Sequence, residues 1–167
     1  MIPITVRYAE LKDVPAVTSI YNDYVVYTTA TFDVTPKHIE ERTAWFHEHP
    51  RESRYKLLVA EDEHHAVLGF AATNPFRPKE AYHSSVETTV YVARGMRSRG
   101  IGADLYHRLF EEMEQTDVHR AYACISLPNP ASLALHEKFG FSPVGVFHEA
   151  GHKFGRYISI QWMEKQF

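Results

Sequence analysis

The sequence has few of the residues that mark a secreted, membrane-bound or metal-binding protein. A single cysteine, Cys124, excludes an internal disulfide. No apolar run approaches the roughly 20 residues that span a bilayer, and no apolar stretch follows a basic region near Met1. The 11 histidines are scattered and never fall in an H-E-x-x-H or Cys/His ligand spacing. These absences favour a cytoplasmic protein without a metal and without a membrane partner.

An excess of charge of one sign is also missing. The 18 basic and 21 acidic residues leave a net charge of −3, which gives no general electrostatic reason to bind nucleic acid. Repeats, low-complexity tracts and Gly/Ser linkers are absent as well. What remains is an ordinary globular composition, with 44% hydrophobic and 23% charged residues. We therefore expect one compact domain over residues 1–167.

The first 50 residues predict a strand and two helices. Residues 4–8 alternate in the manner of a strand. Asp13 suits a helix N-cap, with Pro15 in the first turn and apolar residues following at helical spacing. Thr35 and Pro36 repeat this cap-plus-proline signature. A second helix is therefore expected to open there and to stop near Pro50.

The middle of the chain predicts three strands. Residues 57–61 and 67–73 flank a polar turn at 62–65, so they are expected to form a hairpin. Residues 85–92 follow a proline-broken segment and alternate cleanly. One face of this strand carries Val86, Thr88, Val90 and Val92, and the other carries Ser85, Glu87, Thr89 and Tyr91.

The last third of the chain alternates helices and strands. A glycine-rich turn at 97–102 leads into a helix with one apolar stripe: Ile101, Leu105, Leu109 and Met113. A strand at 121–126 holds Cys124, interpreted as a small buried hydrophobe rather than a nucleophile. A short helix opens at Asn129, ends at Gly140 and is followed by strands around 144–147 and 157–163. This order predicts an α+β fold, a twisted mixed sheet of about seven strands and about four helices, with parallel crossovers around the two later helices.

The turn at 97–102 has the physical features of a diphosphate site. The first turn of a helix leaves backbone N–H groups unpaired at the positive end of the helix dipole. Gly100 and Gly102 let an anion approach the backbone, and Arg97 and Arg99 add positive charge. The alternative is a plain glycine turn before a helix. The segment matches neither a P-loop nor a G-x-G-x-x-G fingerprint after the first strand.

The same turn, Arg97-x-x-Gly100-x-Gly102-Ala103, resembles the R/Q-x-x-G-x-G/A signature of the GNAT N-acetyltransferases. The resemblance implies a GNAT fold, acetyl-CoA as co-substrate and a coenzyme site formed by three segments. Val90, Tyr91 and Val92 would line the pantetheine arm, partly through their backbone. Asn129 would also contact that arm. The pyrophosphate would be held by Ser98, Arg99, Gly100, Ile101, Gly102 and Ala103.

Further segments are similar to the phosphinothricin and methionine sulfoximine acetyltransferase branch of this family. They run in order from residue 29 to residue 156 and include 29–33, 44–46, 76–82, 86–92 and 153–156. Many GNAT members have tyrosine where this chain has His136, whereas this branch carries histidine there. The implied acceptor is a small amino-acid-like amine such as phosphinothricin, methionine sulfoximine or methionine sulfone, and the implied assembly is a homodimer.

Two residues are predicted to be catalytic. Glu87 interrupts a strand of otherwise strand-favouring residues, and the resemblance puts it at the position of the family's general base. The alternative is an exposed charge on a solvated sheet face. His136 could protonate the leaving thiolate or relay a proton, because imidazole titrates near neutral pH. The alternative is a packed or hydrogen-bonded helix histidine. Carbonyl polarisation is assigned to a backbone N–H of the strand at 90–92.

The acceptor side is predicted from a basic, proline-shaped loop. Arg77, Lys79 and Tyr82, with Pro78 between them, could bind an acidic group such as a phosphinate or carboxylate. The resemblance adds Thr88 and Thr89 as substrate contacts and Phe32 as a wall of the pocket. The alternative is a solvated basic loop. Lys153 and Arg156 are read as a mainly structural pair around a turn.

Two other functions remain open on the sequence. A GNAT enzyme could acetylate a polyamine, an aminoglycoside or a protein N-terminus instead. The basic pair Arg77 and Lys79 argues against the first two, which are cationic acceptors. A non-catalytic acyl-CoA sensor would keep the 97–103 loop but would tolerate loss of Glu87, so the presence of Glu87 disfavours it.

Overall fold

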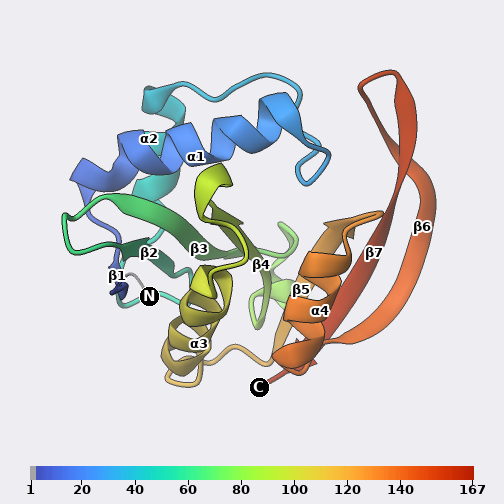
Figure 1. The fold of residues 1–167 in the computed structure, drawn as a ribbon. Helices are drawn as coiled ribbons and strands as arrows, with labels where there is room; N and C mark the ends of the chain where they lie inside the picture. Colours follow the sequence, from blue (N-terminus) through green and yellow to red (C-terminus); the bar gives the residue numbers. More distant parts are fainter. Residues whose placement is uncertain (1–2) are drawn as a thin grey trace.

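The computed structural model describes residues 3–167, which form one seven-stranded sheet between two pairs of helices (Figure 1). Helices α1 (Val14–Tyr27) and α2 (Ile39–His47) cover one face, and α3 (Ile101–Met113) and α4 (Pro130–Lys138) lie on the other. The strands, in chain order, are β1 (Thr5–Tyr8), β2 (Leu57–Glu61), β3 (Val67–Pro75), β4 (Ser85–Val92), β5 (Arg120–Ser126), β6 (Ser142–Lys153) and β7 (Arg156–Gln166). Their spatial order is β1-β2-β3-β4-β5-β7-β6. The predicted α+β fold, its element order and its mixed sheet are confirmed.

The sheet divides between β4 and β5, its only parallel neighbours in the part of the chain described. Their pairing ends after three residue pairs, Ser85↔Arg120, Val86↔Ala121 and Glu87↔Tyr122. Beyond Glu87 the two strands separate. The crossover through α3 joins them, as predicted. The crossover through α4 leads from β5 to β6, which run in the same direction but have β7 between them, so it creates no second parallel pair.

The predicted start of the second helix at Thr35 is wrong, because α2 begins at Ile39. The backbone of Lys37 is held outside the helix by Asn22, which accepts from its N–H (2.8 Å) and donates to its carbonyl (2.9 Å). Thr35 precedes a proline and is thereby disfavoured from helical geometry. The helix is instead capped at His38, whose N–H donates to the Glu41 carboxylate at 2.9 Å.

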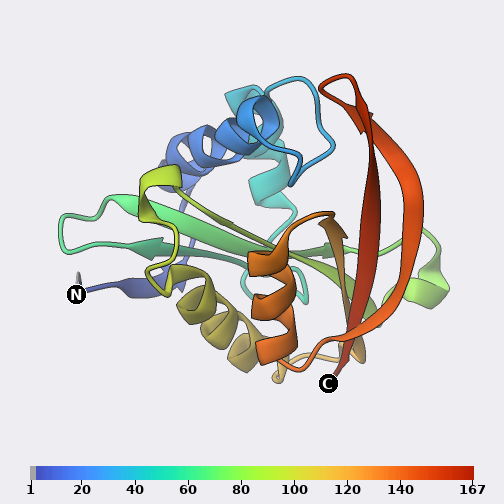
Figure 2. The ribbon, with the colours of Figure 1, turned by 45° about the vertical axis from the view of Figure 1, so that its right-hand side comes forward.

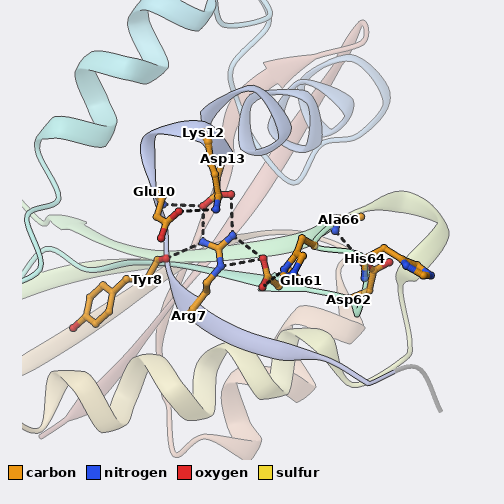
Figure 3. Close-up of polar contacts among 10 residues, drawn as sticks. Arg7, Tyr8, Glu10, Lys12, Asp13, Glu61, Asp62, His64 and Ala66 are labelled. Atoms are coloured by element: carbon orange, nitrogen blue, oxygen red, sulfur yellow. Dashed lines mark hydrogen bonds and ion pairs between the residues drawn. The ribbon is translucent and has the colours of Figure 1, made fainter.

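Asp13 occupies the predicted N-cap position of α1, but its side chain does not cap the helix. It accepts two bonds from Arg7, at 2.7 and 3.0 Å, and Arg7 also donates twice to Glu61, at 2.7 and 3.0 Å (Figure 3). The two carboxyl side chains are only 5% and 8% exposed. One guanidinium thus ties β1, the turn before α1 and the end of β2 together.

The β6–β7 hairpin is longer than the predicted strands at 144–147 and 157–163. Register shifts beside Gly145 and Gly151 interrupt the alternation of its side chains, so the sequence pattern indicated only part of each strand. Its tip curves towards the loop between α1 and α2 (Figure 2). There Phe32 lies so close to Gly151 that an added Cβ would overlap its ring. The buried Lys153 donates to the carbonyl of Thr31 at 2.8 Å. This supports the structural reading of Lys153.

Candidate active site

A cavity of about 530 Å³ lies where β4 and β5 separate. Its walls come from β4, β5, the turn before α3 and the start of α4. Most of the predicted coenzyme residues line it: Val90, Tyr91, Val92, Ser98, Gly100, Ile101, Gly102, Ala103 and Asn129. Arg99 is not among the lining residues, whereas Arg97 is. The split in the sheet therefore brings together segments that are far apart in the sequence.

The start of α3 has the geometry that an anion needs. Gly100 is the N-cap with φ of +87°, a left-handed conformation that glycine adopts without strain. The first helical bonds are those from Ala103 and Asp104 to the Gly100 carbonyl, so the N–H groups before them face outward. A Cβ on Gly102 would stand 3.4 Å from Leu135 and 3.9 Å from Val90. Both separations are ordinary van der Waals contacts, so Gly102 lies in close packing with β4 and α4. These residues fit a diphosphate.

The backbone of β4 offers one open position to a ligand. Ala93 donates to Leu68 at 2.8 Å, so alternate residues of β4 direct their amides to β3. Val90 and Val92 therefore direct their N–H and C=O groups towards the gap on the β5 side. The Tyr24 hydroxyl occupies both groups of Val92, donating to its carbonyl at 2.7 Å and accepting from its N–H at 3.3 Å. Val90 is left with its backbone groups facing the cavity.

The start of α4 supplies a second polar contact. Asn129 caps the helix as predicted, because its Oδ1 accepts from the Ser132 N–H at 3.2 Å. The amide Nδ2 is then available as a donor on the cavity side. A residue fixed by the helix that it caps can hold a ligand without losing side-chain freedom on binding.

His136 is buried in α4 and lines the cavity with both ring nitrogens engaged. Its Nδ1 lies 2.7 Å from the Ser132 carbonyl, which can only accept, so Nδ1 carries the proton. Its Nε2 lies 2.8 Å from the hydroxyl of the fully buried Tyr106 and accepts from it. Burial lowers the pKa of His136, partly opposed by the Ser132 carbonyl. This geometry favours a neutral, hydrogen-bonded imidazole.

Glu87 lies at the last β4–β5 pair, on the face covered by α1 and α2. It is half-buried, outside the residues that line the cavity. Burial raises the pKa of its carboxyl, and the nearby Arg77 guanidinium partly opposes this. A carboxylate with a raised pKa is a better proton acceptor than a solvated one. The strand thus presents Glu87 at the fork, on the opposite face from His136.

The acceptor-side residues are only partly brought together. Arg77 stacks over Phe76 and Trp162, with its guanidinium carbon 4.5 and 5.5 Å from the ring centres. Tyr82 packs against Phe76 at 5.8 Å. All four loop residues, Arg77, Pro78, Lys79 and Tyr82, are exposed. Phe32, on the α1–α2 loop, lies against Gly151 of the hairpin and is not among the residues that line the cavity. The Thr89 side chain shares the Glu87 face and lines the cavity.

Thr88 points to the other face and is buried in packing. Its hydroxyl donates to the Tyr122 carbonyl at 3.3 Å and lies 3.4 Å from the Tyr106 oxygen. Thr88 also lines the cavity, and its predicted substrate contact stays a prediction.

Sequence reasoning missed the aromatic wall beside Glu87. Phe76 stacks on Tyr122 with ring centres 4.2 Å apart, and Trp162 packs edge-on at 5.9 Å. The only signal was aromatic residues on two strands, without any indication that β5 and β7 are neighbours. Cys124 was also misjudged, because it is half-buried and lines the cavity. Burial raises the pKa of its thiol to about 11, so it stays protonated rather than nucleophilic.

The described residues form neither a metal-ligand cluster nor a membrane-spanning helix. Within residues 3–167, no three histidine, cysteine or carboxylate side chains gather in a metal-binding cluster. Over the same residues, no helix has the length and apolar character to cross a membrane.

Comparisons with known proteins agree in family across almost the whole chain. A family model described as an acetyltransferase (GNAT) domain matches residues 6–162. A phosphinothricin N-acetyltransferase of Streptomyces coelicolor is 48% identical over 163 residues, covering 97% of this chain and 95% of the relative. An L-methionine sulfoximine/L-methionine sulfone acetyltransferase of Pseudomonas aeruginosa is 37% identical over 160 residues, covering 96% and 92%.

Solved structures extend the agreement to the fold. A ribosomal-protein-alanine N-acetyltransferase from Brucella melitensis superposes with a TM-score of 0.93 at 39% identity, covering 98% of this chain and 99% of that one. A phosphinothricin acetyltransferase from Sinorhizobium meliloti in complex with AcCoA has a TM-score of 0.93 at 31% identity, covering 98% and 88%.

A mixed sheet that splits beside a glycine-capped helix defines an N-acyltransferase fold. The chain belongs to the GNAT acetyltransferase family, whose members use acetyl-CoA, and it is an enzyme similar to the phosphinothricin N-acetyltransferases.

Proposed function

We propose that this enzyme transfers an acetyl group from acetyl-CoA to the amine of a small amino-acid-like acceptor, of the class of phosphinothricin, methionine sulfoximine and methionine sulfone. The observation that carries the proposal is Glu87, a half-buried carboxylate with a raised pKa beside the Arg77 cation, at the fork of the sheet. The base and the anion-binding group that such an acceptor needs are then neighbours.

The coenzyme side is formed by the cavity. The N–H groups at the start of α3, from Ser98 to Ala103, would hold the pyrophosphate, with Arg97 and Arg99 adding charge. The Asn129 amide would donate to the pantetheine arm. The Val90 N–H is the open backbone donor of β4 and would polarise the thioester carbonyl. Bound acetyl-CoA supplies the activated acetyl group.

Glu87 is the general base of the proposed reaction. At neutral pH an α-amine is mostly protonated and cannot attack a carbonyl, so one proton must first leave. Glu87 takes it, directly or through water, while Arg77 keeps enough of the carboxyl ionised. The amine nitrogen then bonds to the acetyl carbon as the carbon–sulfur bond breaks and the thiolate leaves. The nitrogen loses a second proton in this step, which balances the proton that the thiolate takes up.

His136 contributes as a hydrogen-bonded group at the thiolate end. Its neutral tautomer is fixed by the Ser132 carbonyl and Tyr106, so protonation of the thiolate by His136 would first require its Nε2 to gain a proton. Because the pKa of His136 is lowered, the resulting imidazolium gives up its proton readily.

The acidic end of the acceptor is assigned to the loop after β3. Arg77, Lys79 and Tyr82 provide the charged and phenolic donors, Pro78 shapes the loop, and Thr89 contacts the α-carboxylate. The aromatic wall of Phe76, Tyr122 and Trp162 favours an acceptor with an apolar or thioether-like body. Phe32 completes the pocket from the hairpin side.

A thiol-release assay with acetyl-CoA tests the acceptor class. The panel contains phosphinothricin, methionine sulfoximine, methionine sulfone, ordinary amino acids, spermidine, an aminoglycoside and a peptide with an N-terminal alanine. Turnover confined to the first three supports the proposal. Turnover of spermidine or the aminoglycoside alone would overturn the assignment of Arg77 and Lys79.

A protein N-terminus is the second candidate acceptor, because the Brucella structure carries the name of a ribosomal-protein-alanine N-acetyltransferase. It predicts turnover of the alanine peptide above that of methionine sulfone. A protein that binds acetyl-CoA but turns over none of the panel would instead support a sensor.

The assembly proposed is a homodimer through the β6–β7 hairpin. Val144, Val146, Phe147 and Tyr157 are exposed along it, at 38–68%, and β6 is an edge strand. Light scattering should give twice the mass of one 167-residue chain, and Phe147→Arg should give a monomer. A monomeric parent protein would remove this part of the proposal. We assign the enzyme to the cytoplasm as a single domain, with no nucleic acid or membrane partner.

A further inference from the structure

Helix α2 holds one side chain at the end of β3 in a fixed orientation. The Trp45 indole N–H donates to Oδ1 of Asn74 at 3.0 Å. His49 stacks on Trp45 with ring centres 4.4 Å apart, and its Nδ1 lies 2.7 Å from the Trp45 carbonyl. The amide oxygen of Asn74 is therefore committed to α2. Its Nδ2 carries two N–H donors. The buried His49 Nε2 interacts with the Asn74 side chain and has no other partner in residues 3–167, so one donor is assigned to it and the second remains for another group.

The register of the sheet puts those donors next to the proposed base. Asn74 and Glu87 are directly opposite partners of the antiparallel β3–β4 pair, so both side chains leave the same face of the sheet. Opposite Cβ atoms in such a pair are about 5 Å apart. The neighbouring pair on this face is Ala72↔Thr89, where a small alanine leaves room.

The Glu87 carboxylate has need of a donor. Burial and the Arg77 charge are the influences on its pKa, and no hydrogen bond to it comes from any group within residues 3–167. A half-buried carboxylate that receives no hydrogen bond from the protein commonly receives one from a bound water. Asn74, opposite Glu87 in the β3–β4 register, carries a side-chain amide on the same face of the sheet.

We propose that Asn74 is a positioning residue for Glu87, donating through Nδ2 to a water that bridges to the carboxylate. This rests on the proposed function, in which Glu87 is the base. When the acceptor amine loses a proton, its N–H bond breaks and the proton passes to the bridging water. One of the water's own protons passes to Glu87, so the water is restored. The Trp45 N–H holds the Asn74 amide oxygen, so the amide cannot rotate and turn its oxygen towards the water.

The electrostatic consequence gives a direct readout. A hydrogen bond to the ionised form of a carboxyl favours that form and lowers its pKa. Asn74 therefore limits the rise that burial imposes on Glu87. Removing its donors should raise the pKa further, by about one pH unit, or tenfold in proton affinity.

The test is a carbon-13 NMR titration of the glutamate side-chain carboxyls, with Glu87→Gln assigning the Glu87 signal. In Asn74→Leu, which keeps the shape but loses the amide, the midpoint should move up by about one unit. Trp45→Phe should move it in the same direction by less, since the amide can then rotate. His47→Ala, an exposed site on the same helix, is the control and should move nothing. An unchanged midpoint in Asn74→Leu overturns the proposal, and Asn74→Ser replaces it if that variant does not fold.

The acid limb of kcat/KM gives a second readout on the same variants. It should move up with the NMR midpoint in Asn74→Leu, while the acetyl-CoA dissociation constant stays unchanged. An acid limb that stays in place would overturn the role of Asn74. Full activity of Glu87→Gln would instead overturn the proposed base, and the NMR midpoint would still decide whether Asn74 acts on Glu87.

Discussion

Two glutamates on the same sheet have opposite electrostatic settings. Glu61, at the end of β2, accepts from Arg7 and His65, and its pKa falls to about 2. Glu87, on β4, is half-buried with a guanidinium nearby but no donor in contact, and its pKa rises. The first carboxylate is saturated by its partners and holds elements together. The second is left short of partners and can take a proton.

The two settings imply opposite contributions to stability. The folded pKa of Glu61 lies below the ordinary carboxyl value of about 4.3, so its contribution is complete above that pH and is lost as the pH falls towards 2. The folded pKa of Glu87 lies above the ordinary value, so its ionised form weakens the fold near neutral pH. Functional sites commonly carry such a cost.

The sharpest contrast is expected from Glu87→Gln. Loss of the base should lower kcat by roughly 10²–10⁴-fold, because general base catalysis contributes about that much. Thermal stability should stay the same or rise slightly, since a disfavoured charge is removed. Stopped-assay kinetics and a melting curve measure these two quantities, and calorimetry checks that acetyl-CoA still binds. A variant with normal kcat would end the base assignment.

The reverse pattern is expected from Arg7→Met. Removing the guanidinium leaves Asp13 and Glu61 buried without their cation, which should cost about 3 kcal/mol of the free energy of unfolding. Activity per folded molecule should be unchanged, because the network lies outside the cavity. Urea denaturation at pH 7 and pH 3 checks the size. If the loss is the same at both values, the carboxylates are not its source.

A smaller effect is expected on the pH profile of Arg77→Ala. Arg77 lowers the pKa of Glu87, so its removal should shift the acid limb of kcat/KM to higher pH. The KM for an acidic acceptor should also rise, by about tenfold for a lost charged contact. The matched variant is Lys79→Ala. Lys79 does not influence the pKa of Glu87, so this variant should alter KM alone. An acid limb at the parent position would mean that Arg77 acts on the substrate only.

The smallest effect is expected from Tyr106→Phe. The lost hydroxyl stabilises neutral His136 through Nε2, so the imidazole pKa should rise modestly while remaining below its ordinary value. A rate change of about fivefold corresponds to one neutral hydrogen bond. Proton NMR of the imidazole signals gives the direction. The control is Tyr8→Phe, which removes a hydroxyl that bonds Glu112 on the far part of α3.

Local patterns predicted the elements around the cavity well. The alternation at 85–92 predicted strand β4 and placed Glu87 and Thr88 on opposite faces of the sheet. Asn129 caps its helix as expected. Both depend on a few consecutive residues. The glycine signature likewise reports a short-range requirement, a left-handed residue before a helix.

Features that join distant segments could not be predicted. Asp13 satisfied every local rule for a helix cap, but its carboxylate instead accepts hydrogen bonds from Arg7 of the neighbouring strand β1. The stacking of Tyr122 on Phe76 depends on which strands are adjacent. The link from Asn74 to Glu87 depends on register, which a single sequence does not specify.

The contact of Phe32 with Gly151 and of Lys153 with Thr31 makes the α1–α2 loop and the β6–β7 hairpin one recombination unit. Any chimera that imports the loop from a relative without its hairpin would set a foreign side chain against the glycine, or leave a buried ammonium without its carbonyl. Swaps that seek a new acceptor should therefore exchange both segments together, although more than 100 residues separate them in the chain.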